Sequence, residues 1–159
     1  MRISALGAKA VFWALALATL GFSATAQQPS AIGLWLDNEG RAGVEITRCD
    51  KSMCGKIVWL KEPLDPQGKP WTDVNNTDTS RRATPVCGLQ IIGDLKREAN
   101  GDWVGGWVYD PEVGKRFSVE FSVKDADTLS VFAFDGERAR SQVFDWKRMP
   151  DTTPRCKEP

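Results

Sequence analysis

Short segments in which apolar and polar residues alternate recur along most of the chain, and they predict β-strands. The clearest is 117–124, where Phe117, Val119, Phe121 and Val123 alternate with polar residues. Such alternation is typical of a strand with one buried and one exposed face. No window after the N-terminal region carries the apolar period of a helix. The pattern predicts eight strands, at about 32–36, 42–49, 54–61, 87–95, 102–109, 116–124, 128–135 and 140–148.

Turn residues between these segments predict short hairpin links. Asn100-Gly101 and Asp135-Gly136 are two-residue hairpin signals, and 110–114 combines a proline with a glycine. Consecutive antiparallel strands of this kind predict an all-β fold, an up-and-down barrel of about eight strands whose closure removes exposed edges. A barrel of this size holds either its own side chains or one small ligand.

One connection, 62–85, is much longer than the others. Its 24 residues include Pro63, Pro66 and Pro70 and show no strand pattern. Loops beyond roughly 12–15 residues inside a compact domain are usually functional or disordered. Trp71 in the middle of this segment predicts that the loop packs against another part of the protein.

The N-terminus has the order of a secretory signal. Arg2 and Lys9 precede an uncharged run at 10–22, and Ala24-Thr25-Ala26 resembles a cleavage site. The run of 13 residues is shorter than the roughly 20 that cross a bilayer; the alternatives are an uncleaved anchor or a buried helix. We therefore expect a periplasmic or secreted protein with a signal peptide at 1–26, a barrel domain at 27–150 and a tail at 151–159.

Composition limits the partners and the chemistry. After cleavage, 21 acidic and 19 basic residues remain, a net charge of −2, which gives no reason to expect nucleic acid or an anionic membrane surface as a partner. The chain contains no histidine, which is the commonest general base and metal ligand. We expect no catalytic residues, no metal and no cofactor.

Acidic residues in the loops have some features of two kinds of site. Asp73, Asn75 and Asp78 have only part of the spacing of a calcium loop, and Asx turns within the loop explain them better. Carboxylate pairs among the turn residues Asp65, Asp73, Asp78, Asp110 and Glu112 could resemble a glycosidase site, but solvated turns are the more ordinary interpretation.

All four cysteines, Cys49, Cys54, Cys87 and Cys156, lie in the exported part. An even number in such a protein predicts two disulfides. Zinc-binding and redox-active cysteines are less consistent with the sequence, because it lacks a C-x-x-C motif.

Hairpin register selects one disulfide pairing. If Cys49 faces Cys54 across a four-residue loop, Ile46 opposes Ile57 and Val44 opposes Trp59, so the apolar pairs share one face. A one-residue slip would not sort them in this way. We therefore predict Cys49–Cys54 and, by elimination, Cys87–Cys156.

The candidate ligand-binding residues are aromatic residues on the predicted strands and one arginine. The aromatic side chains either line a cavity or fill the core; they are Trp59, Trp107, Tyr109 and Phe121, with Phe132 or Phe134. Arg82 either binds an anionic head group over the barrel mouth or forms an ion pair with Asp73 or Asp78. We expect Arg81 to be solvated.

Two separated features resemble the lipocalin-like (calycin) barrels. Gly33-Leu34-Trp35 opens the first predicted strand, and Arg148 lies near the end of the last. The resemblance implies that Arg148 stacks over Trp35 and closes one end of the barrel, a contact of about 0.5–2 kcal/mol. Both residues are therefore expected to be structural.

The whole segment from 32 to 148 also resembles DUF2147, a bacterial family of exported proteins of unknown function. The matching stretches occur in order: Gly33-Leu34-Trp35, Val44-Glu45-Ile46 with Cys49, 54–60, Asp73-Val74-Asn75-Asn76, Arg82, 87–91, Trp103-Val104-Gly105-Gly106, 109–112, Gly114-Lys115 and Trp146-Lys147-Arg148. The tail with Cys156 lies outside them. The resemblance implies a lipocalin-like periplasmic barrel and no particular reaction.

These observations predict a periplasmic, non-enzymatic barrel that binds a small apolar or amphipathic ligand through Trp59, Arg82, Trp107, Tyr109 and Phe121. The alternative is a protein-interaction module with a filled core, whose 62–85 loop docks on an envelope protein. A cavity of roughly 300 Å³ or more lined by the aromatic residues would favour ligand binding, and a filled interior would favour the alternative.

Overall fold

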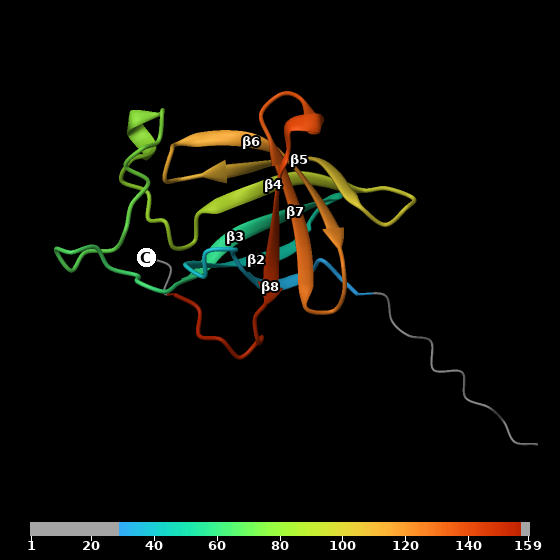
Figure 1. Ribbon diagram of the computed structural model, residues 1–159. Coiled ribbons are helices and arrows are strands. Elements are labelled where there is room, and N and C mark those ends of the chain that lie inside the picture. The colour runs from blue at the N-terminus through green and yellow to red at the C-terminus, as the bar shows by residue number, and fades with distance from the viewer. Residues whose placement is uncertain (1–28, 157–159) are drawn as a thin grey trace, which may run out of the picture.

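Eight antiparallel strands close into a barrel in the computed structural model, which describes residues 29–156 (Figure 1). Each strand pairs with the next in sequence, and β1 pairs with β8. The strands are β1 (Gly33–Leu36), β2 (Ala42–Cys49), β3 (Ser52–Leu60), β4 (Gln90–Arg97), β5 (Trp103–Asp110), β6 (Lys115–Val123), β7 (Thr128–Phe134) and β8 (Gln142–Arg148). Two 3-10 turns, η1 (Thr79–Arg81) and η2 (Arg138–Arg140), lie in connections.

The eight-stranded up-and-down barrel predicted from the alternation is confirmed. The bounds differ most at β4, which begins at Gln90, three residues later than expected, because the chain before it still belongs to the long connection. The predicted signal peptide at 1–26 lies outside the described residues. Between residues 29 and 156, no helix is both long and apolar enough to cross a membrane.

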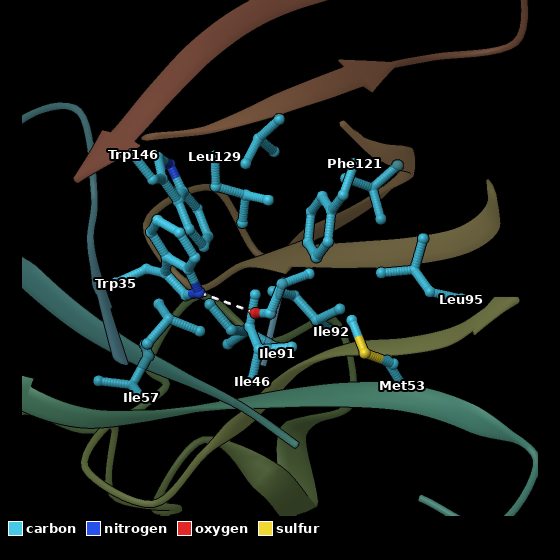
Figure 2. Close-up of a cluster of buried hydrophobic side chains, with 14 of the residues drawn as sticks. Trp35, Ile46, Met53, Ile57, Ile91, Ile92, Leu95, Phe121, Leu129 and Trp146 are labelled. Carbon is cyan, nitrogen blue, oxygen red and sulfur yellow. Dashed lines mark hydrogen bonds between the residues drawn. The ribbon is translucent and has the colours of Figure 1, made fainter. Parts of the chain in front are cut away.

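Large apolar side chains fill the barrel interior (Figure 2). Phe121 is fully buried and packs against Trp146, with their ring centroids 6.3 Å apart. Side chains in protein cores are close-packed, with few voids that could hold a ligand. The fully buried members of this core include Trp35, Val44, Ile46, Met53, Ile92, Leu95, Val119 and Leu129.

Arg148 closes one end of the barrel against Trp35, as the lipocalin resemblance implied. The guanidinium carbon lies 4.0 Å from the centroid of the Trp35 ring. The same guanidinium donates to the backbone oxygens of Ser30, at 2.6 Å, and Ile32, at 3.2 Å. Gly33 makes this possible, because a Cβ atom there would overlap Nη1 of Arg148.

The β2–β3 hairpin has a register two residues away from the predicted one. Cys49 pairs with Ser52, so the turn contains two residues and not four. Asp50 in this turn has a φ of 51°, a left-handed conformation that Asp tolerates. The Cys49–Cys54 disulfide forms diagonally, with Cα atoms 5.8 Å apart. A shift of two keeps each side chain on its face, so the apolar side of the hairpin is still the inner one.

Trp59 lies on the outer face of the barrel, whereas the predicted pairing with Val44 placed it inside. The register shifts between Gly43 and Val44, so that Trp59 pairs with Gly43 and Ile57 pairs with Val44. Val58 is the extra residue of this β-bulge, which reverses the faces that follow it. A Cβ on Gly43 would lie 2.9 Å from Trp59 Cβ and 3.1 Å from Met149 Sδ.

The segment after β8, residues 149–156, returns along the outside of β1–β3 and is here called the tail strap. Its Cys156 forms a disulfide with Cys87 in the β3–β4 connection. The Cys156 N–H donates to the backbone oxygen of Val58 at 2.7 Å, and Arg155 pairs with Glu45 at 2.7 Å. Both predicted disulfides are therefore confirmed, and the second joins the tail strap to the long connection.

Candidate functional site

A buried carboxylate ties the β3–β4 connection, residues 61–89, to the outer face of the barrel. Asp73 is fully buried. Its Oδ1 accepts a hydrogen bond from the Tyr109 hydroxyl of β5 at 2.7 Å, and its Oδ2 accepts one from Asn76 Nδ2 at 2.6 Å. Burying a carboxylate is costly unless donors replace its water. These two donors therefore hold the loop in one position against β5.

Tyr109 is protonated throughout the physiological pH range. Burial, followed by the hydrogen bond to Asp73, raises the pKa of the Tyr109 hydroxyl to about 12. The hydroxyl is thus always available as the donor that Asp73 requires.

Asn75 makes a second attachment, to the β5–β6 turn. Its Nδ2 donates to the backbone oxygens of Glu112, at 2.7 Å, and Pro111, at 3.3 Å. Gly114 permits this close approach, because it has a φ of 66° and a Cβ atom there would overlap the Asn75 carbonyl oxygen. The loop and the turn therefore dock backbone against backbone.

After these attachments, the loop forms a short 3-10 turn, η1 (Figure 1, green). Asp78 caps η1, with its Oδ1 accepting from the Ser80 hydroxyl at 2.7 Å and the Ser80 N–H at 3.0 Å. These bonds lower the pKa of the Asp78 carboxyl. Arg82 stabilises the same segment by donating from Nε to the Asn76 backbone oxygen at 2.9 Å.

A hollow of about 590 Å³ opens between this loop and the outer face of β5 and β6, and we call it the loop hollow. Tyr109 and Trp107 face it from β5. Val108, between them, pairs with the inward-facing Ile92 and with Phe117, so its neighbours point outward. The remaining lining residues are Asp73, Asn76, Thr77, Asp78, Arg81, Thr84, Leu89, Gln90, Gly114, Lys115 and Arg116.

The indole ring of Trp107 is held in one position in the wall of the loop hollow. Its Nε1 donates to Asp94 Oδ2 at 2.8 Å. A Cβ on Gly93 would lie 2.5 Å from the Trp107 ring, so glycine is needed there for the indole to lie on β4. The guanidinium carbon of Arg116 lies 4.0 Å from the centroid of the Trp107 ring. Arg116 is thereby held at the hollow by a cation–π contact.

A second hollow, of about 820 Å³, lies on the outer faces of β3, β4 and β5 beside the β2–β3 hairpin. Its lining contains no aromatic residue: Cys49, Asp50, Lys51, Ser52, Cys54, Gln90, Gly93, Asp94, Lys96, Val104 and Gly105. Small-molecule sites combine apolar or aromatic surface with a few polar groups. The loop hollow offers aromatic surface together with polar groups, whereas the second hollow offers no aromatic surface.

The predicted ligand-binding residues therefore lie in four different places. Trp107 and Tyr109 meet in the loop hollow, Phe121 belongs to the filled core, and Trp59 lies beside the tail strap. Arg82 stabilises the loop backbone. The expected ion pair of Arg82 with Asp73 or Asp78 is not formed between these residues; Arg82 instead donates from Nε to the Asn76 backbone oxygen at 2.9 Å.

Sequence reasoning missed the roles of Asp73, Arg81 and Arg116. Asp73 is neither the calcium ligand nor the ion-pair partner that its sequence context suggests. Arg81 is exposed, as expected, and its side chain also lines the loop hollow. Arg116 shares an outer face with Trp107 across the β5–β6 pair. Correct strand pairing could have placed these two residues together, whereas the contact between Asp73 and Tyr109 has no local sequence signal.

A family model described as "Uncharacterized protein conserved in bacteria (DUF2147)" matches residues 33–148. The chain belongs to this family. The solved structure described as "Protein HP1028 from the human pathogen Helicobacter pylori belongs to the lipocalin family" is similar to this DUF2147 chain, with a TM-score of 0.67 and 19% sequence identity over 78% of this chain and 86% of that one. At this identity the likeness shows a lipocalin-like fold. The search of curated proteins found no match.

Proposed function

We propose that the protein is a non-enzymatic periplasmic binding protein that takes a small amphipathic molecule in the loop hollow. The observation that carries this proposal is the contrast between the filled barrel interior and the hollow of about 590 Å³ beside it. That volume lies within the roughly 300–1,000 Å³ of typical small-molecule sites. The aromatic surface of Trp107 and Tyr109 and the polar groups of the loop suit a molecule with an apolar and a polar part.

The periplasmic part of the proposal is supported by chemistry. Both disulfides are compatible with an oxidising compartment outside the cytoplasm, and the N-terminal sequence has the order of an export signal. The non-enzymatic part rests on the absence of histidine from the chain and on the structural hydrogen bonds made by Asp73 and Asp78 at the hollow.

Native mass spectrometry of protein taken from the periplasm without refolding tests the proposal. We expect a bound mass in the wild type and in Trp71→Leu, and its loss in Trp107→Leu. Trp71 is the matched control, because it belongs to the same loop but does not line the loop hollow. Apo mass alone, together with no thermal shift from a panel of lipids and metabolites, would contradict the proposal.

A second candidate function is a protein-interaction module. Three large apolar residues of the long loop are exposed: Leu64 by 50%, Trp71 by 43% and Val74 by 59%. An envelope protein that is recovered with the wild type and lost when all three are changed to serine would favour this function. Its recovery with the triple variant would argue against it.

A further inference from the structure

We propose that the molecule in the loop hollow carries an anionic group, a carboxylate or a phosphate, which is bound by Arg81 and Arg116. This inference rests on the proposed function of the loop hollow as a binding site. It adds the chemical class of the ligand and the two residues that recognise it.

Arg116 is ordered without an acidic partner. Its guanidinium carbon lies 4.0 Å from the centroid of the Trp107 ring. The indole is held in turn by its hydrogen bond to Asp94, and it packs against Gly93, which has no side chain. Among residues 29–156, no hydrogen bond or ion pair engages the Arg116 side chain. An arginine held over an aromatic face keeps the N–H groups at its edge available for an anion.

Arg81 reaches the loop hollow from the opposite wall, at the end of η1. The cap made by Asp78 fixes this turn, so the position of Arg81 does not depend on its own side-chain contacts. Within the part of the chain that the structure describes, its guanidinium has no hydrogen-bond or ion-pair partner. The side chains of Arg81 and Asp78 interact only through their charges.

The other charged groups of the loop hollow are already engaged. Asp73 accepts from Tyr109 and Asn76, and Asp78 accepts twice from Ser80. Lys115 forms an ion pair with Asp135. The two arginines are therefore the charged lining residues whose hydrogen-bonding capacity is unused. Their planar groups match carboxylate and phosphate oxygens in a two-point geometry.

Apolar surface beside the arginines explains why the ligand would be an anionic amphiphile and not a free inorganic anion. Leu89, Trp107 and Tyr109 line the same hollow. An alkyl or ring portion against these residues would be removed from water, which favours binding.

Isothermal titration with four compounds tests this inference on the full mature chain. Octyl phosphate and octanoate share a tail with the neutral octyl glucoside, and inorganic phosphate has the charge without the tail. All are used below their critical micelle concentrations. We expect octyl phosphate and octanoate to bind at least about tenfold more tightly than octyl glucoside, because only the anionic compounds can accept charge-assisted hydrogen bonds from the two arginines. Inorganic phosphate should bind more weakly than octyl phosphate.

Three variants test whether Arg81 and Arg116 are the residues that bind the anionic group. Arg81→Gln and Arg116→Gln should each weaken octyl phosphate binding about tenfold, with little change for octyl glucoside. Arg97→Gln is the matched control: Arg97 also lies over a tryptophan, 5.9 Å from the Trp103 ring centroid, but outside the loop hollow. It should bind octyl phosphate like the wild type, and thermal unfolding will show that all three variants are folded.

Two results would overturn the inference separately from the proposed function. If octyl glucoside binds as tightly as octyl phosphate, the hollow is a binding site but its ligand is not anionic. If octyl phosphate binds equally to the wild type, Arg81→Gln and Arg116→Gln, the anion lies elsewhere. Binding of none of the four compounds would overturn both the inference and the proposed function.

Discussion

Asp73 and Tyr109 determine at the residue scale where the long loop lies. The carboxylate is fully buried, and the Tyr109 hydroxyl is one of its two side-chain donors. A buried acceptor that loses a donor retains its desolvation cost. The position of the loop, and with it the shape of the loop hollow, therefore depends in part on this hydroxyl group.

Replacing Tyr109 by phenylalanine should lower the free energy of unfolding by about 2–3 kcal/mol, because a hydrogen bond to a buried charged group is lost. Urea unfolding followed by circular dichroism measures this change. Ser80→Ala is the control, because it removes a hydroxyl that donates to the exposed Asp78; we expect less than about 0.5 kcal/mol. Equal losses in the two variants would contradict the role of Asp73 and Tyr109.

Tyr109 is the only tyrosine in the chain, so absorbance near 295 nm reports its ionisation alone. We expect a midpoint at about pH 12 in the folded protein, against 10.0 for the ordinary value. Since folding raises this pKa, the stability it contributes is complete below pH 10 and is lost as the pH rises towards 12. Asp73→Asn should lower the midpoint only in part, because burial is the larger cause. A wild-type midpoint near 10 would show that the hydroxyl is not buried.

Single residues also show what the sequence could not predict. Gly33 and Trp35 were recognised as a structural motif, and their relation to Arg148 followed from the lipocalin resemblance. The bulge at Val58, which turns Trp59 outward, depends on pairing with Gly43 and has no signal in the alternation of β3. Arg81 lines the loop hollow, whereas Arg82 binds the loop backbone. This difference depends on the backbone path of η1, which hydrophobic periodicity does not predict.

At the scale of elements, the strands and the existence of the long loop were predictable, and the docking of that loop was not. Alternation indicates a strand wherever one face is buried, so all eight strands were found within a few residues of their bounds. The predicted register of the β2–β3 hairpin was wrong, since its turn has two residues and not four. Because the register differs by an even number of residues, the inward-facing apolar side was still predicted correctly. Docking of the loop depends on contacts such as Asn75 with Glu112, 37 residues apart, which no local pattern encodes.

Gly114→Ala tests the backbone docking of the loop. The new Cβ would overlap the Asn75 carbonyl oxygen at a φ of 66°. Gly40→Ala has nearly the same strain, with a φ of 69°, but nothing within 4 Å of the Cβ. We expect Gly40→Ala to cost about 1–2 kcal/mol and Gly114→Ala to cost at least about 2 kcal/mol more. Limited proteolysis should cleave the 61–89 segment faster in Gly114→Ala alone, and equal effects would contradict the docking.

At the scale of the whole molecule, two attached segments lie on the outside of a closed barrel. The long loop covers part of β5 and β6, and the tail strap covers part of β1–β3. The Cys87–Cys156 disulfide joins these segments to each other across 69 residues of sequence. Cys49–Cys54 spans only five and closes a hairpin turn.

Replacing each cysteine pair by serine should distinguish the disulfide that joins the loop to the tail strap from the one that closes the hairpin turn. From the chain entropy of loop closure, loss of Cys87–Cys156 is expected to cost about 4 kcal/mol and loss of Cys49–Cys54 about 2 kcal/mol. Chemical denaturation under non-reducing conditions measures both. Because Trp59 lies beside the tail strap, the Cys87/Cys156 variant should also show increased fluorescence quenching by acrylamide. A larger loss in the Cys49/Cys54 variant would contradict the proposed role of the tail strap.

The central claim is that a ligand binds beside the barrel, in the loop hollow, and not inside it. Indole N–H signals in a ¹⁵N-labelled sample test this claim directly, because Trp107 lines the loop hollow while Trp35 and Trp146 belong to the filled core. On titration with octyl phosphate, we expect the Trp107 signal, assigned with Trp107→Leu, to shift, and those of Trp35 and Trp146 to remain in place. Shifts of Trp35 and Trp146 with Trp107 unchanged, or no shift of any indole signal, would contradict it.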